Sequence, residues 1–207
     1  MRKGKIMKNI VFATNNINKI KEFKEILGKR NINLLSLADL KYDKEIIEDG
    51  NSFEENALIK AKQVSKDTGY ITISDDSGLC VDSLNGAPGI FSARYSGFGS
   101  SENNKLLLKN MEGIENRNAH FTCAICLYYP NGKYVIATGR VDGVIATTLK
   151  GDNGFGYDPL FYLKEYGKTM AEVSSEVKDK ISHRANAIKK LGELVDEDFN
   201  IIWFTWG

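Results

Sequence analysis

Apolar and polar positions near the start of the chain alternate in the order of a strand followed by a helix. Residues 10–13 form a short apolar block, and residues 17–27 carry apolar side chains on one stripe at the helical period. Gly28 follows, and glycine commonly ends a helix. The pattern predicts a buried strand over 10–13 and an amphipathic helix over 17–27.

A helix-start signal opens the next amphipathic stretch. Ser52 is followed three residues later by Glu55, which is the spacing of a capping box. An apolar stripe then continues to about Lys66, so we predict a helix over this stretch. Residues 70–74 have the composition of a strand, and we expect that strand to end at Asp75.

Strand patterns dominate the middle of the chain. Residues 121–129 and 134–140 flank the turn signal Pro130-Asn131-Gly132, which predicts a hairpin. Further predicted elements are a strand over 144–148 and helices over 102–111 and 183–195. Strand and helix units followed by a hairpin indicate an α/β protein with a mixed sheet.

The length bounds the domain organisation. A chain of 207 residues can form one well-buried core or two closely joined lobes. We expect residues 1–7 to form a loose extension and residues 8–207 to form a single two-lobed domain. Two lobes around a cleft would suit the order of the predicted elements.

Composition and charge narrow the class of protein. Hydrophobic residues make up 42% of the chain, charged residues 27%, and the net charge is +1. Nucleic-acid and membrane-surface binders usually show a basic face or a large charge imbalance, so we expect neither partner. The sequence has no run of about 18 apolar residues and no apolar block long enough for a signal peptide. We therefore expect a cytoplasmic protein.

The cysteines agree with a reducing compartment, since their number, three, is odd. Cys123 and Cys126 form a C-x-x-C, but they fall within a predicted strand. Side chains three apart on a strand point to opposite faces. We therefore predict that both are core residues rather than a metal or redox pair.

Polar residues gather where the first strand gives way to a helix. Thr14, Asn15 and Asn16 are hydrogen-bonding residues at this junction, and Lys19 adds a positive charge. A helix N-terminus favours anions, so the segment is a candidate phosphate site. It contains neither a Walker A motif nor G-x-G-x-x-G. An Asn-rich capping turn with a solvated lysine is the alternative.

Lys60 occupies an unusual place on the second predicted helix. It falls within the apolar stripe, and Asn56 lies one turn earlier on nearly the same side. A lysine there either extends to the rim of the apolar surface or meets an anion.

Acidic residues form a third cluster. Asp75 and Asp76 are adjacent, and Glu48 lies in the turn before the Lys60 helix. Neighbouring carboxylates repel, and a divalent cation such as Mg²⁺ relieves that repulsion. A carboxylate beside a metal can also deprotonate water. The alternative is that the segment from Asp75 to Gly78 is simply a turn.

A Gly-rich loop precedes Asp158. Within it, Gly156 would let the backbone approach a ligand, and Phe155 would stack on a flat base. The alternative is that Phe155 fills the core.

Positive charge also gathers near the start of the last helix. Ser182 is a good N-cap, and His183 and Arg184 follow it, with Lys178 four residues before. Cations at a helix N-terminus oppose the macrodipole, so an anionic or carbonyl-rich partner would relieve the conflict. A solvated basic first turn is the alternative.

These clusters, in this order, resemble the inosine/xanthosine triphosphate pyrophosphatase family, the non-standard purine NTP pyrophosphatases. The similarity runs from Asn9 to about Leu194. The matching segments are Thr14-x-Asn16-x-x-Lys19, Glu48 with Lys60, Asp75-Asp76-Ser77-Gly78, Gly86-x-Pro88-Gly89 with Ser92-Ala93-Arg94, Phe155-Gly156-Tyr157-Asp158-Pro159, and Lys178-x-x-x-Ser182-His183-Arg184.

The resemblance implies a Mg²⁺-dependent hydrolase that converts ITP, dITP and XTP to the monophosphate and pyrophosphate. It also implies a homodimer, and a two-lobed α/β fold in which helices flank a long central mixed β-sheet and a nucleotide cleft lies between the lobes. A related enzyme acting on modified pyrimidine NTPs, as in the Maf-like proteins, and a non-enzymatic nucleotide sensor are the alternatives.

The resemblance also assigns roles to residues. Asp76 would activate water. The implied metal ligands are Glu48, Asp76 and Asp75. The implied triphosphate ligands are Thr14, Asn15, Asn16, Lys19 and Lys60. Residues implied to contact the nucleoside or shape its pocket are Ser77, Phe155, Gly156, Tyr157, Asp158, Lys178, His183 and Arg184.

Overall fold

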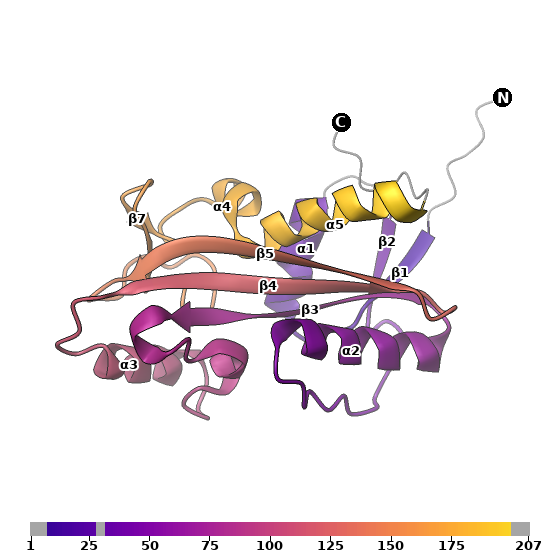
Figure 1. The fold of residues 1–207 in the computed structure, drawn as a ribbon, viewed down its shortest axis with the longest axis horizontal. Coiled ribbons are helices and arrows are strands. Elements are labelled where there is room, and N and C mark those ends of the chain that lie inside the picture. The colour runs from indigo at the N-terminus through magenta and orange to yellow at the C-terminus, as the bar shows by residue number, and fades with distance from the viewer. Residues whose placement is uncertain (1–7, 28–31, 200–207) are drawn as a thin grey trace. The chain divides into compact units, whose positions relative to one another are not determined.

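The computed structural model describes residues 8–27 and 32–199, and these residues form a seven-stranded mixed sheet with helices beside it (Figure 1). The strand order is β2-β1-β3-β4-β5-β6-β7. The strands are β1 Lys8–Phe12, β2 Ile32–Ser36, β3 Ile71–Val81, β4 Asn118–Tyr128, β5 Tyr134–Ile145, β6 Phe161–Leu163 and β7 Lys168–Thr169. β1 pairs in parallel with β2 and β3, whereas β6 pairs antiparallel with β5 and β7. The predicted α/β class with a mixed sheet is confirmed.

Four α-helices begin within two residues of their predicted starts, whereas α4 was not predicted. They are α1 Ile17–Leu27, α2 Phe53–Thr68, α3 Ser100–Asn110, α4 Ser175–Ile181 and α5 His183–Phe199, with short 3₁₀ helices η1 Asp82–Leu84 and η2 Gly89–Arg94. The Ser52 hydroxyl accepts a hydrogen bond from the Glu55 backbone N–H at 3.1 Å. Gly69 ends α2 in the left-handed conformation, with φ 73°. The predicted N-cap is therefore confirmed.

The chain divides into two compact units. Of the described residues, unit 1 comprises 8–27, 32–76, 124–138 and 187–199, and unit 2 comprises 77–123 and 139–186. The predicted extension 1–7 and the predicted helix stop Gly28 lie outside the described residues. The predicted nucleotide cleft stays a prediction.

In unit 1, helices pack on both faces of the strands. Val64 of α2 packs with Val11 of β1, while Phe23 of α1 stacks on Phe12 with ring centroids 4.5 Å apart. Consecutive strand residues point to opposite faces, so α1 and α2 lie on opposite sides of β1. Within unit 1, Figure 1 shows α2 on one side of the strands and α1 with the later part of α5 on the other.

Unit 2 has its own apolar core, which joins residues of β3, β4, β5 and β6 to α3. Phe121 and Phe161 pack with ring centroids 4.6 Å apart, and Leu107 of α3 is fully buried with them. The core members are Leu79, Val81, Leu107, Met111, Ala119, Phe121, Ile145, Tyr157, Leu160, Phe161, Leu163, Met170 and Val173.

Two strand predictions were wrong. β3 does not end at Asp75 but continues to Val81, because it pairs with β1 on one side and β4 on the other. β5 continues to Ile145, so no separate strand covers 144–148. A Cβ on Gly143 would lie 2.7 Å from the Phe161 ring, so this glycine admits β6 to the sheet rather than breaking the strand.

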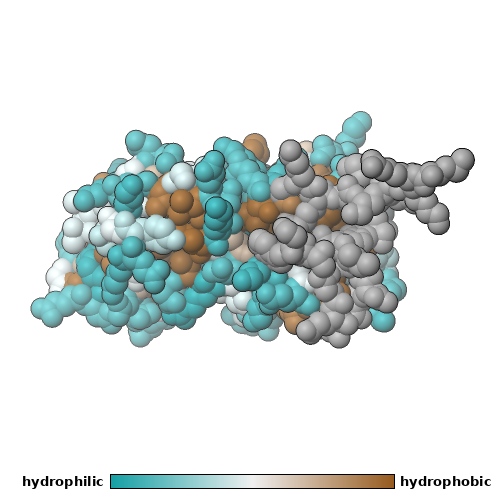
Figure 2. Space-filling model, turned by 90° about the horizontal axis from the view of Figure 1, so that it is seen from above, coloured by the Kyte–Doolittle hydropathy of each residue, from teal (hydrophilic) through white to brown (hydrophobic). Residues whose placement is uncertain are grey.

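The remaining predictions concern the two cysteines of the C-x-x-C, the polarity of the surface and membrane-spanning segments. Cys123 and Cys126 are free thiols and fully buried in β4, as predicted for core residues. On the face drawn in Figure 2, hydrophilic side chains cover most of the described surface, with smaller hydrophobic areas between them. Among the described residues, no helix has the length and apolar content needed to cross a bilayer.

Candidate functional site

Asp75 and Asp76 lie in the middle of β3, where strand alternation sends their side chains to opposite faces. Asp75 is fully buried and pairs with Lys19, with Oδ2 3.0 Å from Nζ. Asp76 contacts residues of α2 instead. The predicted strand end at these two residues was wrong, because both continue β3. Their side chains lie on opposite faces, and a metal ion shared by Asp75 and Asp76 stays a prediction.

Asp76 belongs to a cluster on the α2 side of unit 1. Its Oδ2 accepts a hydrogen bond from Asn56 Nδ2 at 3.0 Å, and its Oδ1 lies 3.9 Å from Lys60 Nζ. Lys60 also forms an ion pair with Glu48 Oε2. Lys60 is buried, so of the two predicted outcomes it meets an anion. Two carboxylates, Glu48 and Asp76, thus converge on one ammonium group.

The loop that carries Glu48 is tied to α2 at several points. Asn56 Oδ1 accepts a hydrogen bond from the Gly50 backbone N–H at 2.9 Å. Further along the helix, Gln63 Nε2 donates to the Glu45 carbonyl at 2.8 Å. These bonds hold a segment that is otherwise without helix or strand.

Burial shifts the proton affinity of Asp76. Desolvation raises the pKa of this carboxyl above its usual 3.8, and Lys60 and Asn56 oppose the shift. A carboxylate whose pKa is raised holds a proton more readily than an exposed aspartate. Asp76 is therefore suited to accept a proton from water.

The turn before α1 caps the helix with its own side chains. Asn16 Oδ1 accepts hydrogen bonds from the N–H groups of Asn18 and Lys19 at 3.0 and 3.2 Å, and Thr14 Oγ1 accepts one from the Asn16 N–H at 3.1 Å. Several backbone donors at the helix start are therefore already used. Anion binding here would depend on the side chains of Thr14, Asn15, Asn16 and Lys19.

The carboxylates of unit 1 suit a small divalent cation. Within residues 8–27 and 32–199, no three His, Cys, Asp or Glu side chains gather as metal ligands. However, Glu48 and Asp76 already approach one cationic atom, Lys60 Nζ. Mg²⁺ usually takes one or two carboxylates together with phosphate oxygens and waters. This donor set fits Mg²⁺ bound together with a phosphate-bearing substrate.

In unit 2, a buried ion pair holds the aromatic loop. Asp158 Oδ2 accepts hydrogen bonds from Lys178 Nζ at 2.6 Å and from the Phe155 backbone N–H at 2.8 Å. Gly154 has φ 77°, and a Cβ there would lie 2.1 Å from Asp158 Oδ2. Only glycine fits this position without displacing the carboxylate. The half-buried ring of Phe155 is thereby placed by its backbone.

Breaking this ion pair should destabilise the protein. We expect Lys178→Met to lower the free energy of unfolding by about 3–5 kcal/mol, because it leaves Asp158 buried without its cation. Urea unfolding followed by circular dichroism measures the loss. The double variant Lys178→Met with Asp158→Asn should recover much of it, and a double variant no more stable than Lys178→Met would contradict this account.

Two further residues complete the loop. The Tyr157 hydroxyl donates to the Ser92 carbonyl at 2.9 Å, so this side chain shapes the loop from the core. Asn104 Nδ2 donates to the Gly156 carbonyl at 2.9 Å. Sequence reasoning missed Asn104. The signal was an asparagine on the buried side of an amphipathic helix.

The basic residues at the start of α5 are buried in unit 2 rather than solvated. Arg184 is 1% exposed, and its Nη2 donates to Ser77 Oγ at 3.1 Å. Its guanidinium carbon lies 5.9 Å from the Phe155 ring centroid, and Lys178 Nζ lies 5.1 Å from it. The His183 ring stacks on Phe121 with centroids 4.8 Å apart. Unit 2 thus gathers the aromatic ring and donors that the sequence predicted.

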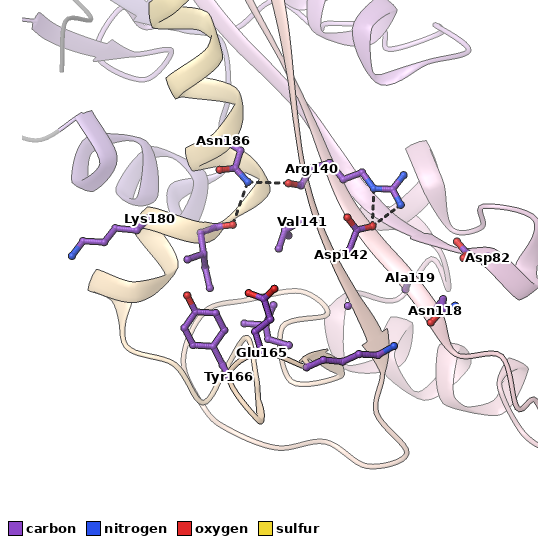
Figure 3. A pocket seen from close by; sticks show the side chains of 14 residues that line it. Asp82, Asn118, Ala119, Arg140, Val141, Asp142, Glu165, Tyr166, Lys180 and Asn186 are labelled. Carbon is purple, nitrogen blue, oxygen red and sulfur yellow. Dashed lines mark hydrogen bonds and ion pairs between the residues drawn. The ribbon is translucent and has the colours of Figure 1, made fainter.

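A separate pocket of about 660 Å³ in unit 2 contains none of the predicted site residues (Figure 3). Arg140 beside it is paired with Asp142, with Nη2 2.5 Å from Oδ1. Asn186 Nδ2 donates to the Arg140 carbonyl at 2.9 Å. The residues that line the pocket include both acidic and basic side chains. Figure 3 shows Lys180 pointing away from the other labelled side chains. The predicted chemistry therefore lies elsewhere.

Relatives of known name cover nearly the whole chain. The chain is 49% identical to the dITP/XTP pyrophosphatase of Bacillus licheniformis over 92% of its own length and 100% of the relative. It is 52% identical to the dITP/XTP pyrophosphatase of Listeria innocua, with coverage of 89% and 93%.

Solved structures agree with the fold. The Ham1 protein of Staphylococcus aureus superposes with a TM-score of 0.83 at 41% identity, covering 92% of this chain and 100% of that one. A nucleoside-triphosphatase/dITP/XTP pyrophosphatase from Mycobacterium abscessus has a TM-score of 0.73 at 43% identity, with coverage of 88% and 98%. The model of the Ham1 family matches residues 10–194, and the chain belongs to this family.

Proposed function

We propose that this protein hydrolyses the non-standard purine nucleoside triphosphates ITP, dITP and XTP to the monophosphate and pyrophosphate. The convergence of Glu48 and Asp76 on Lys60 carries the proposal, because it joins a water-activating carboxylate to a cation-rich setting. The names of the relatives, dITP/XTP pyrophosphatase, support the same activity.

The triphosphate is bound by the cationic side chains of unit 1. Lys19 and Lys60 offset its negative charge, and each is held in place by a carboxylate, Asp75 and Glu48 respectively. Thr14 and Asn16 add hydroxyl and amide groups at the start of α1. Asp75 serves here to orient Lys19, which is the role that their ion pair supports.

Glu48 and Asp76 are the residues that would hold Mg²⁺. When bound, the ion neutralises charge on the phosphates and stabilises the pyrophosphate leaving group. Glu48 is the more accessible of the two, with 35% of its side chain exposed against 12% for Asp76. Asp76, the more buried of the two, would also accept the proton of the attacking water.

Hydrolysis proceeds by attack of water on the α-phosphorus. Asp76 accepts a proton from the water while the oxygen of the water bonds to the α-phosphorus. The bond between the α-phosphorus and the oxygen that bridges the α- and β-phosphates breaks. Pyrophosphate leaves with the electrons of that bond. Positioning and charge stabilisation supply most of the catalysis in such reactions.

The base is recognised by the residues of unit 2. Phe155 offers a ring for stacking, and Arg184 and His183 supply donors near it. Hypoxanthine and xanthine carry an acceptor oxygen at position 6, where adenine carries an amino donor. A guanidinium is a donor only, so it satisfies the oxygen and opposes the amino group.

The first test is pyrophosphate release from ITP, XTP, GTP and ATP, with Mg²⁺ and then with EDTA. We expect fast release from ITP and XTP that stops in EDTA. If folded protein releases pyrophosphate from none of these four, release from a modified pyrimidine NTP would favour the Maf-like alternative. Binding of ITP without release, by folded protein, would favour the sensor.

We also propose a cytoplasmic homodimer. The nucleotide pool that such an enzyme would act on lies in the cytoplasm, and the family resemblance supports a dimer. Phe91 and Phe98 are large exposed apolar residues of unit 2 that a second copy would cover. Sedimentation equilibrium tests the association, and a mass of one chain at micromolar concentration would contradict it.

A further inference from the structure

The side chain of Asn56 makes two hydrogen bonds that the proposed chemistry does not yet use. It lies in the first turn of α2 and is 2% exposed. Its Nδ2 donates to Asp76 Oδ2 at 3.0 Å, while its Oδ1 accepts from the Gly50 backbone N–H at 2.9 Å. One side-chain amide therefore joins the reacting strand to the turn that follows Glu48.

Only one orientation of this amide satisfies both neighbours. The carboxylate of Asp76 accepts hydrogen bonds, and the N–H of Gly50 donates one. A flipped amide would place its oxygen against the carboxylate and its NH₂ against the N–H. An aspartate at position 56 would keep the acceptor for Gly50 but lose the donor to Asp76.

The turn lies directly against the start of α2. A Cβ on Gly50 would be 2.8 Å from Asn56 Oδ1 and 2.7 Å from Glu55 Cβ. Glu48, two residues earlier, pairs with Lys60, which lies one helical turn after Asn56 on the same face. Asn56 and Lys60 thus fix the two carboxylates from one side of the helix.

The two oxygens of Asp76 consequently have different neighbours. Oδ2 accepts from Asn56, and Oδ1 is the atom that lies toward Lys60. The two oxygens of a carboxylate are chemically equivalent, so a half turn about χ2 restores the same contacts, whereas a smaller rotation weakens the Asn56 bond. The bond therefore fixes the plane of the carboxylate, with one oxygen held at Asn56 and the other lying toward Lys60.

We propose that Asn56 is a positioning residue, which fixes the Asp76 carboxylate and the Glu48 turn in one arrangement around Lys60. The role rests on the proposed function, because it acts through Asp76 rather than on the substrate. Lost alignment of a general base lowers turnover more than substrate binding. The effect should therefore appear in kcat rather than in KM.

The kinetic test compares Asn56→Asp with a matched tether variant, Gln63→Ala. Gln63 ties the same loop to the same helix, through Glu45 and Tyr42, without contacting Asp76. At saturating Mg²⁺ we expect Asn56→Asp to lower kcat for ITP roughly 10- to 100-fold. Its KM should stay within about threefold of wild type, and Gln63→Ala should keep kcat within about threefold.

A second measurement needs neither substrate nor metal. Hydrogen exchange by NMR in EDTA reports the Gly50 amide, whose acceptor is the Asn56 side chain. We expect it to exchange at least about tenfold faster in Asn56→Ala than in wild type, and at the wild-type rate in Asn56→Asp. The Ala variant also replaces Asn56→Asp in the kinetic test if the latter does not fold.

The outcomes separate the two proposals. If wild-type protein releases pyrophosphate and Asn56→Asp loses no more kcat than Gln63→Ala, the positioning role is overturned. An unchanged Gly50 exchange rate in Asn56→Ala also overturns it. If wild-type protein cleaves none of the nucleotides, the proposed function fails, and the exchange measurement still decides whether Asn56 holds the turn.

Discussion

Asp76→Asn is expected to lower kcat for ITP about 10³-fold while the protein stays folded. The variant removes the proton acceptor, a change that commonly costs 10²- to 10⁴-fold. The carbonyl of the introduced side-chain amide can still accept from Asn56, so the contacts of β3 with α2 are retained. Pyrophosphate release at saturating ITP and Mg²⁺ measures the loss.

The same variant should not be less stable than wild type at neutral pH in EDTA. Burial raises the pKa of Asp76 in the folded state, so folding favours its neutral form. The cost of the ionised form is fully present above the raised pKa and disappears as pH falls below 3.8. Asparagine is neutral throughout, so its advantage should shrink over that acidic range.

A matched control uses the same substitution elsewhere. Asp82 lies in η1 of unit 2 and belongs neither to the Glu48–Lys60–Asp76 cluster nor to the predicted base site around Phe155. About half of its side chain is exposed. Asp82→Asn should leave kcat within about twofold of wild type. Retention of activity by Asp76→Asn, with Asp82→Asn unchanged, would remove Asp76 as the base.

Arg184→Lys is expected to reduce the preference for ITP over ATP roughly 10- to 100-fold. The lysine keeps the positive charge but loses the planar guanidinium. The hydrogen bonds that this charged group donates to the position-6 oxygen are therefore lost. Arg184→Ala should lose the same preference, together with stability, because it empties a fully buried position and removes a hydrogen bond to Ser77. The ratio of kcat/KM for the two nucleotides is the readout.

Phe155→Ala is the control for base recognition. Stacking contributes about 1–3 kcal/mol per base and tolerates every base, so this variant should weaken ITP and ATP alike. Thermal melting of all three variants separates loss of recognition from loss of folding. Equal losses on ITP and ATP in a folded Arg184→Lys protein would exclude Arg184 from reading position 6.

Local signals in the sequence predicted several elements well. Ser52 and Glu55 marked the start of α2 because a capping box uses only neighbouring backbone groups. The Pro130-Asn131-Gly132 turn marked the end of β4 for the same reason. β2, β6 and β7 escaped prediction, since such short strands gain their stability from pairing with other strands.

The acidic pair shows where local signals fail. Asp-Asp-Ser-Gly has the composition of a turn, and yet it continues β3 because strands on both sides supply hydrogen bonds. That pairing sends Asp75 to Lys19 and Asp76 to Asn56. From the sequence alone, Asp75 and Asp76 were interpreted as one metal site.

By itself, the sequence determined which chemical groups this protein carries and in what order and spacing they follow one another along the chain. Residue type and spacing are local properties. Carboxylates, lysines, an aromatic loop and a basic helix start follow one another in the order of the Ham1 family. Only the tertiary structure decided their partners. Strand alternation separated Asp75 from Asp76, and the packing of the Gly50 turn against α2 brought Asn56 to the Asp76 carboxylate. The contacts of Asp75 with Lys19 and of Asp76 with Asn56 join residues far apart in the chain, and no local pattern encodes them.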